Sequence, residues 1–269
     1  MSSLVEVEDL TVVYGGRRRG TGSRGLSSVS LDVRAGETLG LVGESGSGKT
    51  TLGRALLGLV PVTSGTVRFD GEDITHAHRR RRRALSQRIQ VVFQNPYLSL
   101  NPQRSIVQSV AETLTARSDV GREESRARSI VMLERVGIPA EAADRYPGSF
   151  SGGQRQRIAI ARALVPEPDL VICDEAVSAL DLSIQAQVLN LLVELQDELG
   201  LAYLFITHDL AVVRHLCHRV AVLRHGELVE SGSTDSVCTS PSHPYTRTLM
   251  SSAPVADPRE RTRRIAVST

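Results

Sequence analysis

One short glycine-rich segment constrains the fold of this chain more than any other. It fits the pattern G-x-x-x-x-G-K-[ST] and reads Gly43-Glu44-Ser45-Gly46-Ser47-Gly48-Lys49-Thr50. The apolar stretch 38–42 precedes it, and residues 49–59, with leucines at helical spacing before Pro61, follow it. A loop between a strand and a helix can bind phosphate oxygens through its backbone N–H groups and through the helix N-terminus. The segment therefore predicts a phosphate-binding loop in an α/β fold.

Lys49 is the only lysine among the 32 basic residues of the chain. A lysine ammonium is a compact point charge, which a planar guanidinium does not replace. We expect Lys49 to reach the β- and γ-phosphates of a nucleotide and the Thr50 hydroxyl to bind Mg²⁺. A guanine-specific Asn-Lys-x-Asp motif would need a second lysine, so GTPases are excluded. The predicted loop contacts to the nucleotide are Gly43, Glu44, Ser45, Gly46, Ser47, Gly48, Lys49, Thr50 and Thr51.

Composition excludes several other classes of protein. The 32 basic and 30 acidic residues leave a net charge of +2, which is too small a cation excess to predict nucleic-acid binding. No apolar run reaches the roughly 18 residues of a membrane-spanning helix, and the N-terminus lacks an export pattern. Cys173, Cys217 and Cys238 have no metal-ligand spacing, so we expect free thiols. These features predict a cytosolic protein that could dock on membrane proteins.

Short apolar strands alternate with amphipathic helices through most of the chain. This pattern predicts a mainly parallel sheet covered on both faces. We expect strands over 5–10, 28–33, 38–42, 66–69, 88–93, 169–173 and 202–207, a hairpin over 220–231, and helices over 49–59, 105–117, 122–136, 152–164, 183–199 and up to 217. Residues 15–25 are typical of a mobile loop, and the polar tail after 234 of one short helix near 245–251. The five arginines at 79–83 could contact nucleic acid or lipid, but we favour a solvated helix end.

Asp174 and Glu175 directly follow the apolar strand and should lie at the carboxyl edge of the sheet. Ligands of open α/β sheets bind at that edge. An acidic pair after a strand is by itself more often a helix cap. Together with the phosphate loop, the pair predicts that Asp174 orients Mg²⁺ and that Glu175 polarises the attacking water.

The segment Ser151-Gly152-Gly153-Gln154-Arg155 decides among the nucleotide-binding families that remain. It resembles the signature of ATP-binding cassette (ABC) ATPases, and further motifs of that family occur in the correct order along nearly the whole chain. The positions that match are Tyr14 for the adenine-stacking aromatic, Gln94 in Val-Val-Phe-Gln-Asn-Pro, Ser178-Ala179-Leu180-Asp181 for the D-loop, and His208 in Ile-Thr-His-Asp for the switch histidine.

The resemblance implies a P-loop NTPase core with a mainly parallel sheet, an N-terminal antiparallel β-subdomain and a helical insert. The expected divisions are 1–95 for the β-subdomain and the first part of the core, 96–150 for the helical subdomain, 151–233 for the second part of the core, and 234–269 for the tail. The resemblance also implies ATP and Mg²⁺ as ligands. In this scheme the catalytic residues are Lys49, Glu175 and His208, the metal ligands are Thr50, Gln94 and Asp174, and nucleotide contacts beyond the loop are Tyr14, Gln94, Ser151, Gly152, Gly153, Gln154 and Asp181.

The signature has a physical logic of its own. Ser151 can cap the helix that begins at Gly152, and the bare N–H groups of that helix start offer a second phosphate site. The chain has one phosphate loop and one signature, which the family pattern places on opposite sides of a monomer. We therefore expect ATP to lie between two subunits in a head-to-tail dimer.

Among ABC proteins, the chain is most similar to the ATPases of peptide and nickel importers. The most diagnostic segment is the tail Pro241-Ser242-His243-Pro244-Tyr245-Thr246-Arg247. The resemblance implies an identical or different second ATPase, two integral-membrane permeases, an external solute-binding protein, a position on the cytoplasmic face of the membrane, and no nucleic-acid partner. We expect a peptide importer. The alternatives are a nickel or other small-solute importer, an exporter, and a soluble ABC ATPase that acts on ribosomes or DNA.

Overall fold

A computed structural model describes residues 3–15, 23–115 and 120–252 of the chain. Its largest element is a six-stranded sheet with the order β10-β9-β3-β8-β7-β6. All neighbouring pairs in it are parallel except the β9–β10 hairpin. The strands are β3 (Thr38–Val42), β6 (Ile89–Phe93), β7 (Leu170–Asp174), β8 (Ala202–Ile206), β9 (Arg219–Arg224) and β10 (Glu227–Ser233). The expected α/β fold with a mainly parallel sheet is confirmed.

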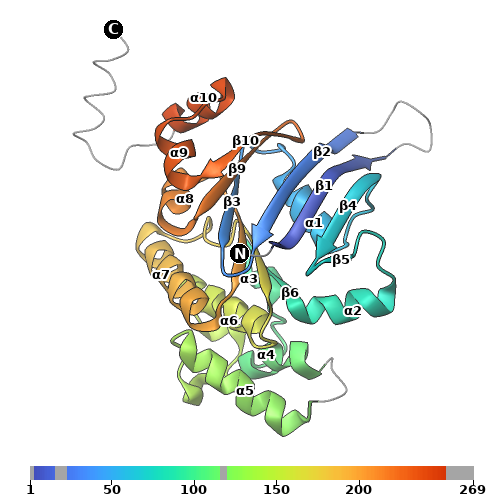
Figure 1. Ribbon diagram of the computed structural model, residues 1–269. Helices are drawn as coiled ribbons and strands as arrows, with labels where there is room; N and C mark the ends of the chain where they lie inside the picture. The colour runs from blue at the N-terminus through green and yellow to red at the C-terminus, as the bar shows by residue number, and fades with distance from the viewer. Residues whose placement is uncertain (1–2, 16–22, 116–119, 253–269) are drawn as a thin grey trace.

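A second, antiparallel sheet packs beside the first and has the order β2-β1-β4-β5 (Figure 1). Its strands are β1 (Ser3–Tyr14), β2 (Ser23–Arg34), β4 (Ser64–Phe69) and β5 (Glu72–Asp73). Asp70 and Gly71 join β4 to β5 with positive φ angles of 54° and 76°, as a tight two-residue hairpin turn requires. Most of the loop expected at 15–25 lies outside the described residues.

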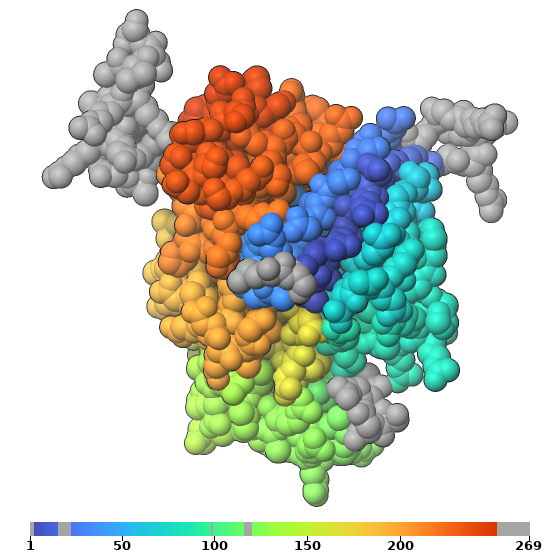
Figure 2. All heavy atoms as spheres, in the orientation of Figure 1, coloured from blue at the N-terminus to red at the C-terminus, as the bar shows by residue number. Residues whose placement is uncertain are grey.

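Helices cover the six-stranded sheet and form a separate lobe. The lobe contains α3 (Pro96–Ser99), α4 (Ile106–Thr115) and α5 (Arg122–Arg135), and Figure 2 shows α4 and α5, in green, at the end of the molecule opposite the red C-terminal helices. The other helices are α1 (Lys49–Leu56), α2 (Arg79–Arg88), α6 (Gly152–Leu164), α7 (Leu182–Leu199), α8 (Leu210–Leu216), α9 (Thr234–Thr239) and α10 (Pro244–Ser252). Within the described ranges, none of them combines the length and the apolar character that a bilayer crossing needs.

The two faces of the sheet belong to two different hydrophobic cores. Alternate residues of a strand point to opposite faces. On β8, Tyr203 and Phe205 therefore pack into the core shared with α6, α7 and the helical lobe, whereas Leu204 and Ile206 pack into the core shared with α1 and the antiparallel sheet. The six-stranded sheet thus joins the helical lobe to the antiparallel sheet, and it carries the loops at its carboxyl edge.

The arginine run at 79–83 lies at the start of α2, as expected for a helix end, but it is not wholly solvated. The Arg82 side chain is half-buried. Its guanidinium donates to the carbonyl oxygens of Leu56 at 3.1 Å and Ile74 at 2.6 Å. Arg82 therefore closes the carbonyl end of α1, because the last carbonyls of a helix lack partners within the helix. Arg79 and Arg80 are exposed, as expected.

Candidate active site

The glycine-rich loop leaves β3 and enters α1 with a backbone shape that glycine alone adopts easily. Gly43, Gly46 and Gly48 have φ angles of 151°, 80° and 109°. A Cβ atom on Gly43 would lie 2.2 Å from the carbonyl oxygen of Leu223, at the end of β9. The loop is therefore pressed against β9. Gly43 and Gly48 are required by both conformation and space, whereas Gly46, with open space around it, is favoured by conformation alone.

Lys49 opens α1 and turns its ammonium back into the loop. Its side chain is buried, and its Nζ donates to the carbonyl oxygens of Gly43 at 2.8 Å and Glu44 at 2.9 Å. Burial lowers the pKa of Lys49, while the nearby charges of Glu175 and Asp174 oppose that shift. Two backbone carbonyls therefore hold the ammonium within the loop that we expect to bind phosphate.

Thr50 and Asp174 are far apart in the sequence but meet at the carboxyl edge of the sheet. The Thr50 hydroxyl donates to Asp174 Oδ1 at 3.2 Å. Burial raises the pKa of Asp174, the hydrogen bond from Thr50 lowers it, and the charge of Glu175 raises it further. A hydroxyl and a carboxylate side by side are the oxygen donors that suit Mg²⁺, so these residues fit such an ion.

Glu175 follows β7 in the left-handed backbone region, with a φ angle of 51°. Its N–H donates to the carbonyl oxygen of Ile206 at 2.9 Å, which ties the strained residue to β8. Its Oε1 lies 3.3 Å from Nδ1 of His208, which leaves the end of β8 and is exposed. The sheet therefore brings together the two side chains that we expected to act on the attacking water and the γ-phosphate.

A cavity of about 280 Å³ lies over the loop. The Tyr14 hydroxyl donates to Thr51 Oγ1 at 3.2 Å, which places the end of β1 at this cavity. Ser23 and Arg24, at the start of β2, also line it and were not anticipated, because the sequence around them is typical only of a loop. The lining residues are Tyr14, Ser23, Arg24, Gly25, Ser45, Gly46, Gly48, Lys49, Thr50, Thr51 and Glu175.

The signature segment forms the start of α6. Ser151 and Gln154 make reciprocal capping bonds: the Gln154 N–H donates to Ser151 Oγ at 3.3 Å, and the Ser151 N–H donates to Gln154 Oε1 at 3.0 Å. A Cβ on Gly153 would lie 2.3 Å from the Ile184 side chain, so α7 requires a glycine there. The described lining of the cavity does not include Ser151, Gly152, Gly153 or Gln154.

Gln94 and Asp181 also lie outside the described lining of the cavity. Gln94 follows β6 and is exposed. Asp181 caps α7, where its Oδ1 accepts the N–H of Ile184 at 3.0 Å and the hydroxyl of Ser183 at 2.8 Å. The structure thus gives Asp181 a clear local role in starting a helix, and it leaves its expected contact with a nucleotide untested.

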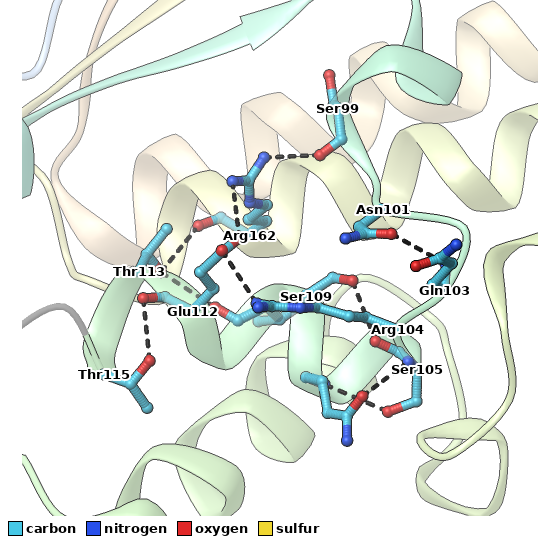
Figure 3. A network of polar contacts seen from close by, with 12 residues as sticks. Ser99, Asn101, Gln103, Arg104, Ser105, Ser109, Glu112, Thr113, Thr115 and Arg162 are labelled. Carbon is cyan, nitrogen blue, oxygen red and sulfur yellow. Dashed lines mark hydrogen bonds and ion pairs between the residues drawn. The ribbon is translucent and has the colours of Figure 1, made fainter.

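A polar network connects the segment after Gln94 to the signature helix (Figure 3). From α6, Arg162 donates to the carbonyl oxygen of Ser99 at 2.6 Å and to Glu112 of α4 at 3.2 Å. Arg104 donates to the other oxygen of Glu112 at 3.0 Å. One guanidinium therefore joins α6 to both the end of α3 and the first long helix of the lobe, α4.

Comparison with known protein families agrees with this arrangement. The family described as "ABC transporter" matches residues 26–178, which is more than half of the chain. The chain belongs to this family. It is therefore an ABC ATPase, an enzyme that couples ATP hydrolysis to transport, and the expected family is confirmed. A second family, described as "Oligopeptide/dipeptide transporter, C-terminal region", matches residues 229–268.

Curated ABC relatives are similar over most of this chain. One, of Brucella abortus (strain 2308), is provisionally named a peptide import ATP-binding protein; it is 49% identical over 259 residues, covering 94% of this chain and 78% of the relative. The dipeptide transport ATP-binding protein of Escherichia coli (strain K12) is 47% identical over 245 residues, covering 91% and 73%. The glutathione import ATP-binding protein of Pectobacterium atrosepticum is 52% identical over 238 residues, which cover 88% of this chain but 38% of that longer relative.

Solved ABC cassettes have the same fold. CbiO1 from Clostridium perfringens, part of the ABC transporter complex cbiONQ, superposes with a TM-score of 0.79 at 30% identity and covers 89% of this chain and 92% of its own. A dimeric cassette in a post-hydrolysis state, bound to ADP and Pi, gives a TM-score of 0.76 at 29% identity, with coverage of 86% and 98%. The expected ABC ATPase fold is confirmed.

Proposed function

We propose that this chain is the ATP-hydrolysing subunit of an importer that takes up peptides. The observation that carries the proposal is the C-terminal match over residues 229–268 to the oligopeptide and dipeptide transporter region, since the ATPase core alone is common to importers and exporters. The names of the relatives, which describe import of peptides, dipeptides and glutathione, support the same substrate class.

The site supports a division of labour among the expected residues. Lys49, positioned by its loop carbonyls, binds the β- and γ-phosphates through its remaining N–H donor, and its charge offsets the charge that develops during transfer. Glu175 accepts a proton from the attacking water, and His208, in contact with Glu175, reports the presence of the γ-phosphate. Tyr14, at the cavity, stacks on the adenine.

Mg²⁺ would be held by Thr50 and Asp174, the two oxygen donors that meet at 3.2 Å, with Gln94 as a further ligand. Bound there, the ion neutralises phosphate charge. Burial raises the pKa of Asp174, and a cation bound beside the carboxylate would favour its ionised form. This unfavourable burial supports a binding role for the carboxylate over a purely structural one.

A second subunit completes the ATP-binding site. The phosphate loop lines the cavity, whereas residues 151–154 do not, so the capped start of α6 is available to a nucleotide held by another chain. Two solved cassettes of the same fold are described as dimers, which supports assembly with a second subunit. The second ATPase is either identical to this chain or a homologue of it.

The helical lobe is the contact with two integral-membrane permeases, which places the chain on the cytoplasmic face of the membrane and near an external solute-binding protein. Tyr97 and Tyr146, both exposed on this lobe, offer aromatic surface to a partner, and Arg155 stacks on the Tyr97 ring at 4.2 Å. The Arg162 network carries movement between this surface and α6 (Figure 3). The transported solute itself touches other subunits.

The test is affinity purification of the tagged full chain from its native host in mild detergent with ATP, followed by identification of the chains that co-purify. Two permeases, a second ATPase and a binding protein are the expected result, with peptides retained by that binding protein. Lys49→Ala is the control for the site itself, because it should lose ATP hydrolysis while its unchanged helical lobe keeps the permeases.

Other outcomes separate the alternatives. Nickel or another small solute on the binding protein would change the substrate, and permeases without any binding protein would indicate an exporter. Ribosomal or DNA-bound partners without permeases would refute the transport proposal and leave only the ATPase activity.

A further inference from the structure

The C-terminal region reaches the phosphate loop. Helices α9 and α10 pack beside the β9–β10 hairpin (Figure 1). In the first turn of α10, Tyr245 is 7% exposed, and its hydroxyl accepts the backbone N–H of Glu44 at 3.1 Å. A residue of the tail motif 241–247 therefore makes a direct hydrogen bond to the loop that binds phosphate.

Tyr245 is held in place from two strands. The Arg224 guanidinium, at the end of β9, lies 4.9 Å from the centre of the Tyr245 ring. The Tyr245 N–H donates to Nδ1 of His243 at 3.1 Å, and Glu230 of β10 accepts the backbone N–H groups of Ser242 at 2.7 Å and His243 at 3.1 Å. The hydroxyl is thus presented to the loop by a segment that is itself anchored to the sheet.

On the loop side, the bond falls on one particular peptide plane. The N–H of Glu44 and the C=O of Gly43 belong to the same peptide unit, which is planar. That carbonyl oxygen accepts the Lys49 ammonium at 2.8 Å. This plane rotates about ψ of Gly43 and φ of Glu44, and Gly43, which has no Cβ, restricts that rotation little. The Tyr245 hydroxyl therefore binds the N–H of this peptide unit, and the Lys49 ammonium binds its C=O.

We propose that Tyr245 is a positioning residue for nucleotide binding: its hydroxyl fixes the Gly43–Glu44 peptide plane and thereby the resting place of Lys49. The tail motif then contributes to the ATPase site without touching ATP. This inference rests on the assignment of residues 43–51 as the nucleotide loop, and it is independent of which solute the transporter carries.

The test compares Tyr245→Phe with Tyr203→Phe in the purified full chain. Both variants keep the ring and lose one buried hydroxyl, since the Tyr203 hydroxyl donates to the carbonyl oxygen of Leu192 at 3.2 Å, away from the loop. We measure the Kd for ATP, the KM and kcat for hydrolysis, and the melting temperature without nucleotide. A role in stability alone would lower the melting temperature of both variants and leave the Kd unchanged.

We expect Tyr245→Phe to raise the Kd and KM for ATP by about three- to tenfold, the usual effect of one lost hydrogen bond, with kcat at saturating ATP within about twofold of the parent. Tyr203→Phe should leave both constants unchanged. A parental Kd in Tyr245→Phe, or equal weakening in both variants, would overturn the inference. If the parent itself bound no ATP, the proposed function would fail instead.

Discussion

Replacing Glu175 by glutamine tests the chemistry of the site with the smallest change of shape. The side chain keeps its volume and its place 3.3 Å from His208, but an amide cannot accept a proton from water. Loss of a general base costs about 10²- to 10⁴-fold in rate. We therefore expect kcat to fall by that factor, which corresponds to about 2.7–5.5 kcal/mol in the activation barrier.

Binding of ATP should respond in the opposite sense. Glu175 lines the cavity beside Lys49, where its negative charge repels phosphates. The glutamine variant should bind ATP at least as tightly as the parent and accumulate as an ATP-bound dimer. Phosphate release at saturating Mg-ATP gives kcat, equilibrium titration gives the Kd, and size-exclusion chromatography with ATP reports the dimer.

Two further variants make the result decisive. Glu194→Gln makes the same chemical change at an exposed position on α7, away from the cavity lining, and should hydrolyse ATP at nearly the parental rate. Adding His208→Ala to Glu175→Gln should cost less than the two single effects combined, because residues in contact act as a unit. A Glu175→Gln enzyme that keeps more than about a tenth of the parental rate would refute the assignment of Glu175 as the base.

Three other expectations concern binding and stability. Tyr14→Ala should weaken ATP binding by about 1–3 kcal/mol if the ring stacks on the base, and an unchanged Kd would make it only a strand residue. Arg82→Met should lower the free energy of unfolding in urea by about 1–3 kcal/mol, because it removes the side-chain donor to the carbonyl of the buried residue Leu56; a parental urea midpoint would contradict the capping role. The hydrogen bond and charge of Arg219 outweigh burial and lower the pKa of Asp32, so this carboxylate stabilises the fold above its ordinary pKa of 3.8, and that stability is lost as the pH falls through the lowered value. Melting curves from pH 7 to 3 should show a smaller acid-induced loss in Asp32→Asn, whereas Asp144→Asn, at a fully exposed pair, should follow the parent; identical curves for all three proteins would be inconsistent with this linkage.

Local sequence patterns predicted the elements that local chemistry determines. Helix α6 begins where expected because Ser151 can cap it. The pairing of Thr50 with Asp174 was also foreseeable, since both follow parallel strands that end at one edge.

Other features depend on contacts between distant segments and gave no local signal. Helix α9 was missed because it is six residues long and is stabilised by tertiary contacts such as the bond from the Thr234 hydroxyl to the carbonyl oxygen of Cys217 at 2.6 Å. The burial of Arg82 could not be read from a run of five arginines, because only the fold brings α1 beneath it. The contact of Tyr245 with Glu44 likewise joins the tail to the first third of the chain.

The Arg162 side chain has a mechanical consequence for how a closed and an open form could differ. It binds the carbonyl oxygen of Ser99 and the carboxylate of Glu112 at the same time, from the helix that the signature begins. A tilt of α6 alone would break the 2.6 Å hydrogen bond from Arg162 to Ser99 and expose part of the guanidinium charge. Rotation of the lobe together with α6 is therefore favoured over movement of α6 alone. Gln94 lies between β6 and α3, in one of the segments that join the lobe to the sheet and would have to change if the lobe turned.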